Sequence, residues 1–137
     1  MPFVDTNLLL YRVSLDPKER FKQEIAAEIL HRDDLFLSTQ VLQEFYVQAT
    51  RPSRSDALTH EEAVCLIESW KRFPVIEGSI HLLDAALAAR ERWQISYWDA
   101  AIIEAARIAG CDTVFSEDLN DGQDFDGVKV FNPFKSV

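Results

Sequence analysis

Four acidic residues occupy positions that an ordinary solvent-facing role explains poorly. Asp5 and Asp118 each follow a short apolar run, Glu44 lies among apolar residues of a helical pattern, and Asp99 directly follows two aromatic residues. Carboxylates about 5 Å apart would repel one another by roughly 3 kcal/mol per pair, so such a group requires protons or a cation. Oxygen ligands without accompanying His or Cys favour Mg²⁺ or Mn²⁺, either of which can activate water for attack on a phosphodiester.

Each acid also has an ordinary structural explanation. Asp5 can cap the helix that follows it, and Glu44 can extend from a helix edge to solvent. Asp99 stands three residues after Ser96, the spacing of a capping box. Asp118 lies in a polar, glycine-containing run that is typical of a loop. Each acid alone is therefore weak evidence for a site, and the set of four is stronger evidence.

Apolar runs and helical periodicity alternate along the chain. Strands are predicted at residues 2–5, 34–37, 73–76, 112–116 and 128–131. Helices are predicted over about 6–13, 16–29, 38–51, 59–70, 79–93 and 96–109. Strands that alternate with helical segments favour a mainly parallel sheet covered on both faces. The predicted fold is a single α/β domain over residues 1–137, a three-layer α/β/α sandwich with a mainly parallel central sheet.

Two helix starts have the spacing of a capping box. One is predicted at Asp16 and Glu19 and the other at Thr59 and Glu62. The helix after Asp16 is predicted to bury one apolar stripe, formed by Phe21, Ile25 and Ile29.

The predicted topology brings the acids together. In a parallel sheet the first and fourth strands, which precede Asp5 and Asp118, share one carboxyl edge. The helices that carry Glu44 and Asp99 begin close to that edge if their connections are short. We therefore expect the four carboxylates to converge.

Composition limits the classes of protein. A length of 137 residues suits one domain, and no stretch approaches the roughly 18 apolar residues of a membrane span. No signal peptide is recognised, so a cytoplasmic protein without a membrane partner is expected. Cys65 and Cys111 have no metal-binding or redox spacing and are predicted to be small core residues.

The formal net charge of −9 is unusual for a protein that binds nucleic acid. An acidic chain can still act on RNA if its acids surround a divalent metal and basic residues line the approach. The candidates for lining that approach are Arg51, Arg54, Lys71 and Arg72. The alternative for each of them is an ordinary role at a solvated helix end.

Other motifs are excluded by specific positions. An EF-hand aligned on Gly122 places Leu119 and Val128 where oxygen ligands belong. No Walker loop, dinucleotide fingerprint or serine nucleophile elbow occurs, and the three histidines lack metal-pair spacing. An aspartyl-phosphate enzyme would want a second Asp at the position of Asn7, which weakens covalent phosphoryl transfer.

With these residues in place, the chain resembles the PIN-domain nucleases, most closely the VapC-type toxins of toxin–antitoxin pairs. The resemblance covers essentially the full length and rests on residues 4–7, 38–45, 97–102 and 116–118. It implies a PIN-like fold and a metal-dependent endoribonuclease that uses Mg²⁺ or Mn²⁺ to hydrolyse RNA. It also implies a protein that is often a homodimer and is silenced by a small antitoxin protein encoded beside it.

The resemblance assigns roles only at matching positions. The metal-binding and catalytic acids it implies are Asp5, Glu44, Asp99 and Asp118. The supporting polar residues it implies are Thr6, Asn7 and Ser116. Glu117 and Asp121 flank Asp118 and either could share its role, but Asp118 lies two residues beyond Ser116, as the family pattern expects.

Two other functions stay open at this point. One is a non-catalytic protein-binding module whose acids are helix caps and whose aromatic residues anchor an interface. This hypothesis is motivated by four aromatic residues, Tyr46, Trp93, Tyr97 and Trp98. Core packing explains such residues more often. The other is a metal-dependent hydrolase of small phosphoesters, which would use the same acids on nucleotides.

Overall fold

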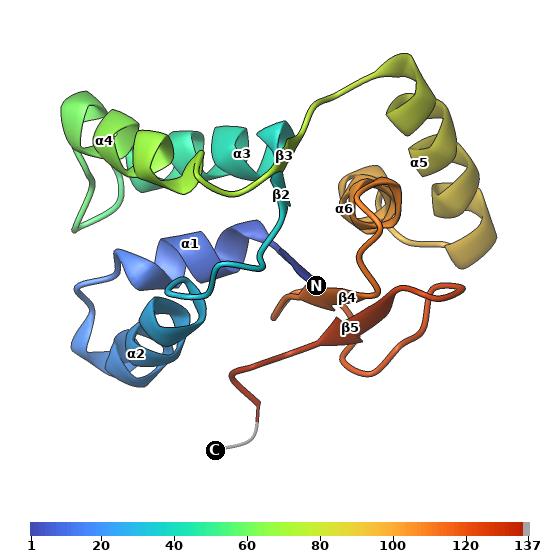
Figure 1. The fold of residues 1–137 in the computed structure, drawn as a ribbon. Helices are drawn as coiled ribbons and strands as arrows, with labels where there is room; N and C mark the ends of the chain where they lie inside the picture. Colours follow the sequence, from blue (N-terminus) through green and yellow to red (C-terminus); the bar gives the residue numbers. More distant parts are fainter. Residues whose placement is uncertain (136–137) are drawn as a thin grey trace.

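The computed structural model describes residues 1–135, which form five short strands and six α-helices (Figure 1). The strands are β1 (Pro2–Val4), β2 (Leu37–Ser38), β3 (Val75–Ile76), β4 (Thr113–Phe115) and β5 (Lys129–Phe131). The helices are α1 (Thr6–Arg12), α2 (Arg20–Ile29), α3 (Thr39–Ala49), α4 (His60–Trp70), α5 (Ile80–Trp93) and α6 (Tyr97–Ile108), with a short 3₁₀ helix, η1 (Pro17–Glu19), before α2.

All five strands run parallel. β4 lies between β1 and β5, and β2 pairs with β3. A parallel bridge between Phe3 and Phe36 joins the two groups, with the Val4 N–H donating to Phe36 O at 2.9 Å. The strand order is therefore β3-β2-β1-β4-β5. The chain places β2 and β3 on one side of β1 and then β4 and β5 on its other side, so the order of the strands reverses at β1. The crevice outside the carboxyl end of such a strand is where open α/β sheets bind ligands.

Helices lie on both sides of the strands. In Figure 1, α6 lies above β4 with α5 packed beside it, whereas α1 and α2 lie to the left of β2. α3 packs against both α1 and α4. This arrangement confirms the predicted three-layer α/β/α sandwich with a parallel central sheet.

The second strand is displaced from its predicted position at 34–37. Asp34 instead forms a bidentate contact with Arg32, at 2.8 Å for both hydrogen bonds, which closes a bend before the strand. Phe36 contributes only the bridge to Phe3. β2 consequently ends at Ser38, whose hydroxyl accepts the Val41 N–H and caps α3.

The predicted capping box of Asp16 and Glu19 is wrong. Asp16 does cap a helix, accepting the Lys18 N–H at 3.0 Å, but that helix is the short 3₁₀ segment η1. The Glu19 carboxylate accepts the Ser14 hydroxyl at 2.7 Å instead of the Asp16 N–H. The Asp16 N–H in turn donates to the Ser14 hydroxyl, so Ser14 takes both partners that would have formed the box.

The buried face of α2 differs from the predicted stripe. Phe21 is 39% exposed, and the fully or nearly buried residues of this segment are Ala26 and Leu30. The other two residues of the predicted stripe are half-buried. The second predicted capping box, Thr59 with Glu62, is present at the start of α4 and is confirmed.

The hydrophobic core surrounds β1 and α1. Phe3 and Val4 on β1 and Leu8 and Leu9 on α1 are completely buried. Because the residues on both sides of Asp5 are fixed by packing, the position of the Asp5 backbone is tightly determined.

The two cysteines differ in environment. Cys111 is buried as predicted, whereas Cys65 is exposed on α4, so its assignment to the core is wrong. Within residues 1–135, no helix combines the length and the apolar character that crossing a bilayer requires.

Candidate acidic site at the carboxyl edge of the sheet

Asp5 lies at the junction of β1 and α1. Its backbone N–H donates to Phe115 O at 3.0 Å, which continues the β1–β4 ladder. Its Oδ1 accepts the Thr6 N–H at 2.7 Å and caps α1. The side chain is only 6% exposed. Asp5 is thus the predicted helix cap and, at the same time, a buried acid at the carboxyl edge of the sheet.

Ser116 and Asn7 join Asp5 to Asp118. The Ser116 hydroxyl donates to Asp5 Oδ2 at 2.7 Å and accepts the Asp118 N–H at 3.1 Å. Asn7 Nδ2 lies 3.5 Å from Asp5 Oδ2 and 3.2 Å from Asp118 Oδ2. Two carboxylates from distant segments therefore share one amide donor at the ends of β1 and β4.

Glu44 reaches the same site from α3. Its Oε1 accepts the Thr6 hydroxyl at 2.9 Å and lies 3.5 Å from Gln40 Nε2. Thr6 thus contacts Asp5 through its backbone and Glu44 through its side chain, which sets the spacing between the two acids. Three of the four predicted acids are joined by this hydrogen-bond network.

Asp99 lies in the first turn of α6 and is half-buried. Its backbone N–H donates to the hydroxyl of Ser96, the N-cap residue, at 3.1 Å. In residues 1–135 the return bond of a capping box, from the Ser96 N–H to the Asp99 carboxylate, is not formed. Burial raises the pKa of Asp99, the Ser96 hydroxyl opposes that rise, and the charge of Asp118 adds to it. Asp99 is therefore coupled to the site by charge without a direct hydrogen bond.

The electrostatics of Asp5 show a surplus of negative charge. Burial raises the pKa of Asp5 to about 6, against hydrogen bonds from Ser116 and the Thr6 N–H that lower it. The charges of Asp118 and Glu44 raise it further. A cation bound beside Asp5 would relieve both the burial penalty and the repulsion.

The donor chemistry of the site fits a hard divalent cation, because all four acids and the supporting hydroxyls and amides offer oxygen. Among the residues described, no three His, Cys, Asp or Glu side chains already lie in an arrangement that could hold a metal ion. Asp5 is fixed by packing, but Glu44 and Asp99 are half-buried and Asp118 is exposed. A shared cation would therefore require these three side chains to turn toward Asp5.

The two residues that flank Asp118 are engaged elsewhere. Glu117 accepts the Tyr11 hydroxyl at 2.5 Å and the Lys22 ammonium at 2.7 Å. Asp121 accepts the Asn132 N–H at 2.8 Å and lies 3.4 Å from Lys135 Nζ.

The Asn132 N–H holds the pKa of Asp121 below its usual range, and burial opposes this lowering. Asp118 is thus the acid of its segment that joins the Asp5 network.

Two surface cavities flank the acids. One, of about 270 Å³, is lined by Glu44, Trp98 and Arg51 among others, and the second, of about 260 Å³, is lined by Asp118 and Asn7 among others. Gln48 lines both cavities. Glu44 and Asp118 therefore each border one of two neighbouring hollows.

Sequence reasoning missed the glutamines of α3. Gln40, Glu44 and Gln48 stand four residues apart, so they share one face of the helix. Gln40 bonds to Glu44, and both glutamines line the cavity of about 270 Å³. The four-residue spacing of Gln40, Glu44 and Gln48 was the sequence signal that could have identified these glutamines.

The four basic residues proposed for substrate approach have different surroundings. Arg54 lines the second cavity but pairs with Asp56 at 2.7 Å. Lys71 pairs with Glu68, and Arg72 donates to the carbonyl of Leu30 at the end of α2. Arg51 lines the cavity that contains Glu44, and within residues 1–135 its side chain has no ion pair.

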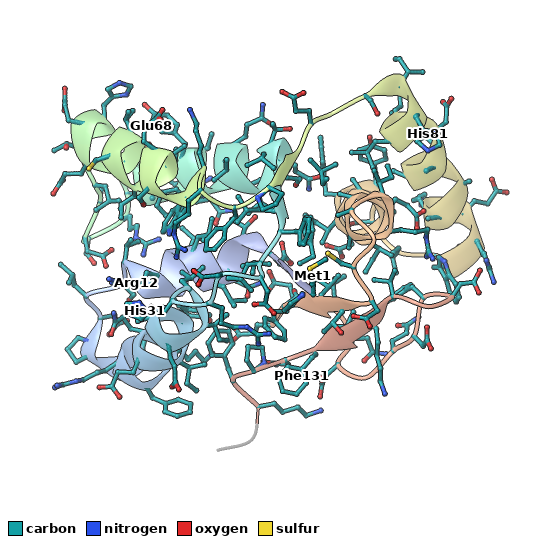
Figure 2. All side chains as sticks on the ribbon, in the orientation of Figure 1. Met1, Arg12, His31, Glu68, His81 and Phe131 are labelled. Carbon is teal, nitrogen blue, oxygen red and sulfur yellow. The ribbon has the colours of Figure 1, made fainter. Side chains whose placement is uncertain are left out.

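The three histidines belong to different segments of the fold. Figure 2 shows the labelled His31 and His81 on opposite sides of the molecule, after α2 and on α5, and both are exposed. His60 lies at the start of α4 and contacts the Tyr46 hydroxyl at 2.8 Å.

Solved structures with a similar fold include a toxin–antitoxin complex and a toxin. A toxin–antitoxin complex from Klebsiella pneumoniae matches with a TM-score of 0.70 at 18% identity, covering 97% of this chain and 98% of that one. VapC20 of Mycobacterium tuberculosis, described as a toxin that cleaves the sarcin-ricin loop, matches with a TM-score of 0.66 at 18% identity, covering 86% and 92%. FitAcB from Neisseria gonorrhoeae matches with a TM-score of 0.65 at 18% identity, covering 98% and 99%.

Among curated proteins, no sequence matches this chain closely enough to serve as a relative. The sequence model of the PIN domain matches residues 3–125, a span that contains all four acids and both cavities. This chain therefore belongs to the PIN domain family.

Proposed function

We propose that this protein is a metal-dependent endoribonuclease that hydrolyses RNA phosphodiester bonds and serves as the toxin of a toxin–antitoxin pair. One observation carries the proposal: a buried carboxylate, Asp5, is joined by shared donors to Asp118 and Glu44 at the carboxyl edge of the sheet. Membership of the PIN domain family and the fold shared with toxin–antitoxin proteins support it.

Asp5, Glu44, Asp99 and Asp118 would hold Mg²⁺ or Mn²⁺. Such an ion, when bound, supplies a Lewis acid that makes a bound water more nucleophilic and offsets the charge of the phosphate. Asp5 is the fixed member, because packing and the Thr6 N–H determine its position.

Thr6, Asn7 and Ser116 are positioning residues in this proposal. The Thr6 hydroxyl orients Glu44, and Asn7 and Ser116 hold the segment of Asp118 against Asp5. Hydrogen bonds of this kind keep carboxylates aligned when they are not bound to a cation, and their loss typically weakens metal binding.

A cleavage assay tests the proposal. Purified protein should cut an RNA oligonucleotide with Mg²⁺ or Mn²⁺ and lose activity in chelator, and Asp5→Asn should lose activity while its circular dichroism spectrum stays unchanged. Lower pH should weaken activity because protons compete for the carboxylates. RNA left intact under all metal conditions, with cleavage of mononucleotide esters instead, would favour the small-phosphoester hydrolase.

We propose a small antitoxin protein as partner and the cytoplasm as location, since the substrate is RNA. Support comes from the similar fold of the Klebsiella pneumoniae chain, which was solved as a toxin–antitoxin complex. Expression of this chain should arrest growth, and co-expression of a small protein encoded beside it should suppress that arrest. Suppression that fails despite stable expression of the neighbour would contradict the pairing.

We further propose a homodimer formed through α5. Ile80, Leu83 and Leu87 are exposed, and their spacing places them on one side of the helix. Sedimentation analysis should give a dimer that dissociates in Leu87→Glu. A monomer in the unsubstituted protein would remove this proposal.

A further inference from the structure

Trp98 is the most exposed aromatic residue of the site. Its side chain is 61% exposed, whereas the other aromatic residues considered as interface anchors, Tyr46, Trp93 and Tyr97, are half-buried. It immediately precedes Asp99 in the first turn of α6. An exposed indole beside a group of acids is not explained by core packing.

The structure holds Trp98 in a defined place. Its ring packs edge-on against Tyr97, with centroids 5.0 Å apart and planes at 81°. Its main-chain carbonyl accepts Gln40 Nε2 at 3.2 Å, and the same amide nitrogen lies 3.5 Å from Glu44 Oε1. Gln40 therefore connects the backbone of Trp98 directly to one of the proposed metal-binding acids.

The cavity beside Trp98 has the chemistry of a nucleobase site. Trp98 and Val47 offer apolar surface, and three glutamine side chains, Gln40, Gln43 and Gln48, offer both donors and acceptors. Arg51 lines the same cavity without an ion pair among the residues described, and Glu44 connects the cavity to the acids. Its volume of about 270 Å³ is below the range of drug-sized pockets, which suits one base better than a larger group.

We propose that Trp98 stacks on an unpaired nucleobase of the RNA next to the phosphodiester that is cut, with Arg51 beside the adjoining phosphate. This inference rests on the proposed ribonuclease function and specifies its substrate as single-stranded or looped RNA. A base can stack on an aromatic ring only when it is out of a duplex.

The net charge supports stacking as the main source of affinity. At −9 the chain repels the phosphate backbone, and Arg51 is a single positive charge at this cavity. Stacking acts at short range and does not require a basic surface. RNA binding should therefore depend less on salt than in proteins that neutralise many phosphates.

Steady-state cleavage of a single-stranded RNA oligonucleotide tests the role of Trp98. Trp98→Ala should raise KM by roughly 5- to 150-fold, the loss expected for one stacked base, with little change in kcat. Trp98→Phe, which keeps an aromatic face, should recover most of the loss. Ile108→Ala, which removes an exposed apolar side chain at the other end of α6, is the matched control and should leave both constants unchanged.

Abasic substitution locates the stacked base. A single abasic nucleotide is moved through the oligonucleotide, and at one position it should raise KM for the unsubstituted protein but not for Trp98→Ala. If Trp98→Ala stays as sensitive at every position, the stacking proposal is wrong. It is also wrong if Trp98→Ala leaves RNA kinetics unchanged and instead alters sedimentation, which would make Trp98 a protein contact.

A binding measurement separates this inference from the proposed function. The Asp5→Asn variant should show quenching of tryptophan fluorescence by single-stranded RNA, and adding Trp98→Ala should remove that quenching. Quenching without cleavage by the unsubstituted protein would contradict the nuclease and retain the stacking site. Cleavage by the unsubstituted protein, without quenching in the Asp5→Asn variant, would contradict the stacking site and retain the nuclease.

Discussion

The Ser116 hydroxyl donates a 2.7 Å hydrogen bond to Oδ2 of Asp5, across 111 positions of the chain. The bond joins the ends of β1 and β4, where the Asp5 N–H also bonds to Phe115 O. Ser116 is completely buried, and its oxygen accepts the Asp118 N–H as well. One hydroxyl therefore fixes the orientation of one acid and the backbone of another.

Removing this hydroxyl should weaken both the fold and the site. Ser116→Ala removes a donor to the buried carboxylate of Asp5, which costs about 1–3 kcal/mol of unfolding free energy, and should weaken Mn²⁺ binding by roughly 10- to 100-fold. Ser14→Ala is the matched control, because Ser14 is also buried and bonds to Glu19 outside the site. Urea denaturation and metal titration measure the two effects. Equal losses of metal affinity in both variants would contradict a specific role for Ser116.

The pKa of Asp5 predicts how stability changes with pH in chelator. Because burial raises this pKa from 3.8 to about 6, the folded protein keeps a proton that the unfolded chain releases. The contribution of Asp5 is therefore fully present below pH 4 and is lost as pH rises toward 6, by roughly 3 kcal/mol in total.

Asp5→Asn should remove the loss of stability that the Asp5 carboxyl causes as pH rises. Asn caps helices as well as Asp does, so the variant should be more stable than the unsubstituted protein at pH 7 and similar to it at pH 4. Urea denaturation between pH 4 and 8 in chelator measures the difference. A variant that is less stable than the unsubstituted protein at pH 7 would contradict the burial of an uncompensated charge.

Substitutions at neighbouring acids should separate their roles. Asp118→Asn should lower cleavage by more than the roughly 100-fold expected for loss of an outer hydrogen-bond partner. Glu117→Gln should leave cleavage nearly unchanged and cost less than about 1 kcal/mol of stability, because its partner Lys22 is partly exposed. Both variants are assayed with the same RNA at saturating Mn²⁺. Loss of cleavage in Glu117→Gln alone would reverse this assignment.

The two cysteines should differ in reactivity. Burial raises the pKa of the Cys111 thiol to about 11, so at pH 8 it stays protonated and shielded, whereas Cys65 is exposed. A maleimide should modify one thiol per folded chain and two in denaturant, with Cys65→Ser abolishing the reaction in the folded protein. Rapid modification of Cys111 without denaturant would show that the end of α6 opens.

The convergence of distant acids could be predicted because a parallel sheet puts the ends of its strands at one edge. Asp5 and Asp118 follow from that rule and from the apolar runs before them. The surroundings of Glu117 could not be predicted in this way, since its contacts with Tyr11 and Lys22 depend on the packing of α1 and α2 against the segment after β4.

Local competition explains the errors in helix caps and exposure. The sequence spacing of Asp16 and Glu19 fits a capping box, but Ser14 forms hydrogen bonds with both partners instead. The exposure of Trp98 depends on how the first turn of α6 lies relative to α3, which hydrophobic periodicity does not specify.

The central place of β1 has a consequence for the cell that makes this protein. Asp5 leaves the ribosome before β4, Ser116 and Asp118, because Ser116 lies 111 positions further along the chain. Until then a nascent chain lacks the strand that pairs with β1 and the donors that align its first acid. A protein that attacks RNA would thus stay harmless to the messenger and the ribosome producing it until those later segments have emerged and folded.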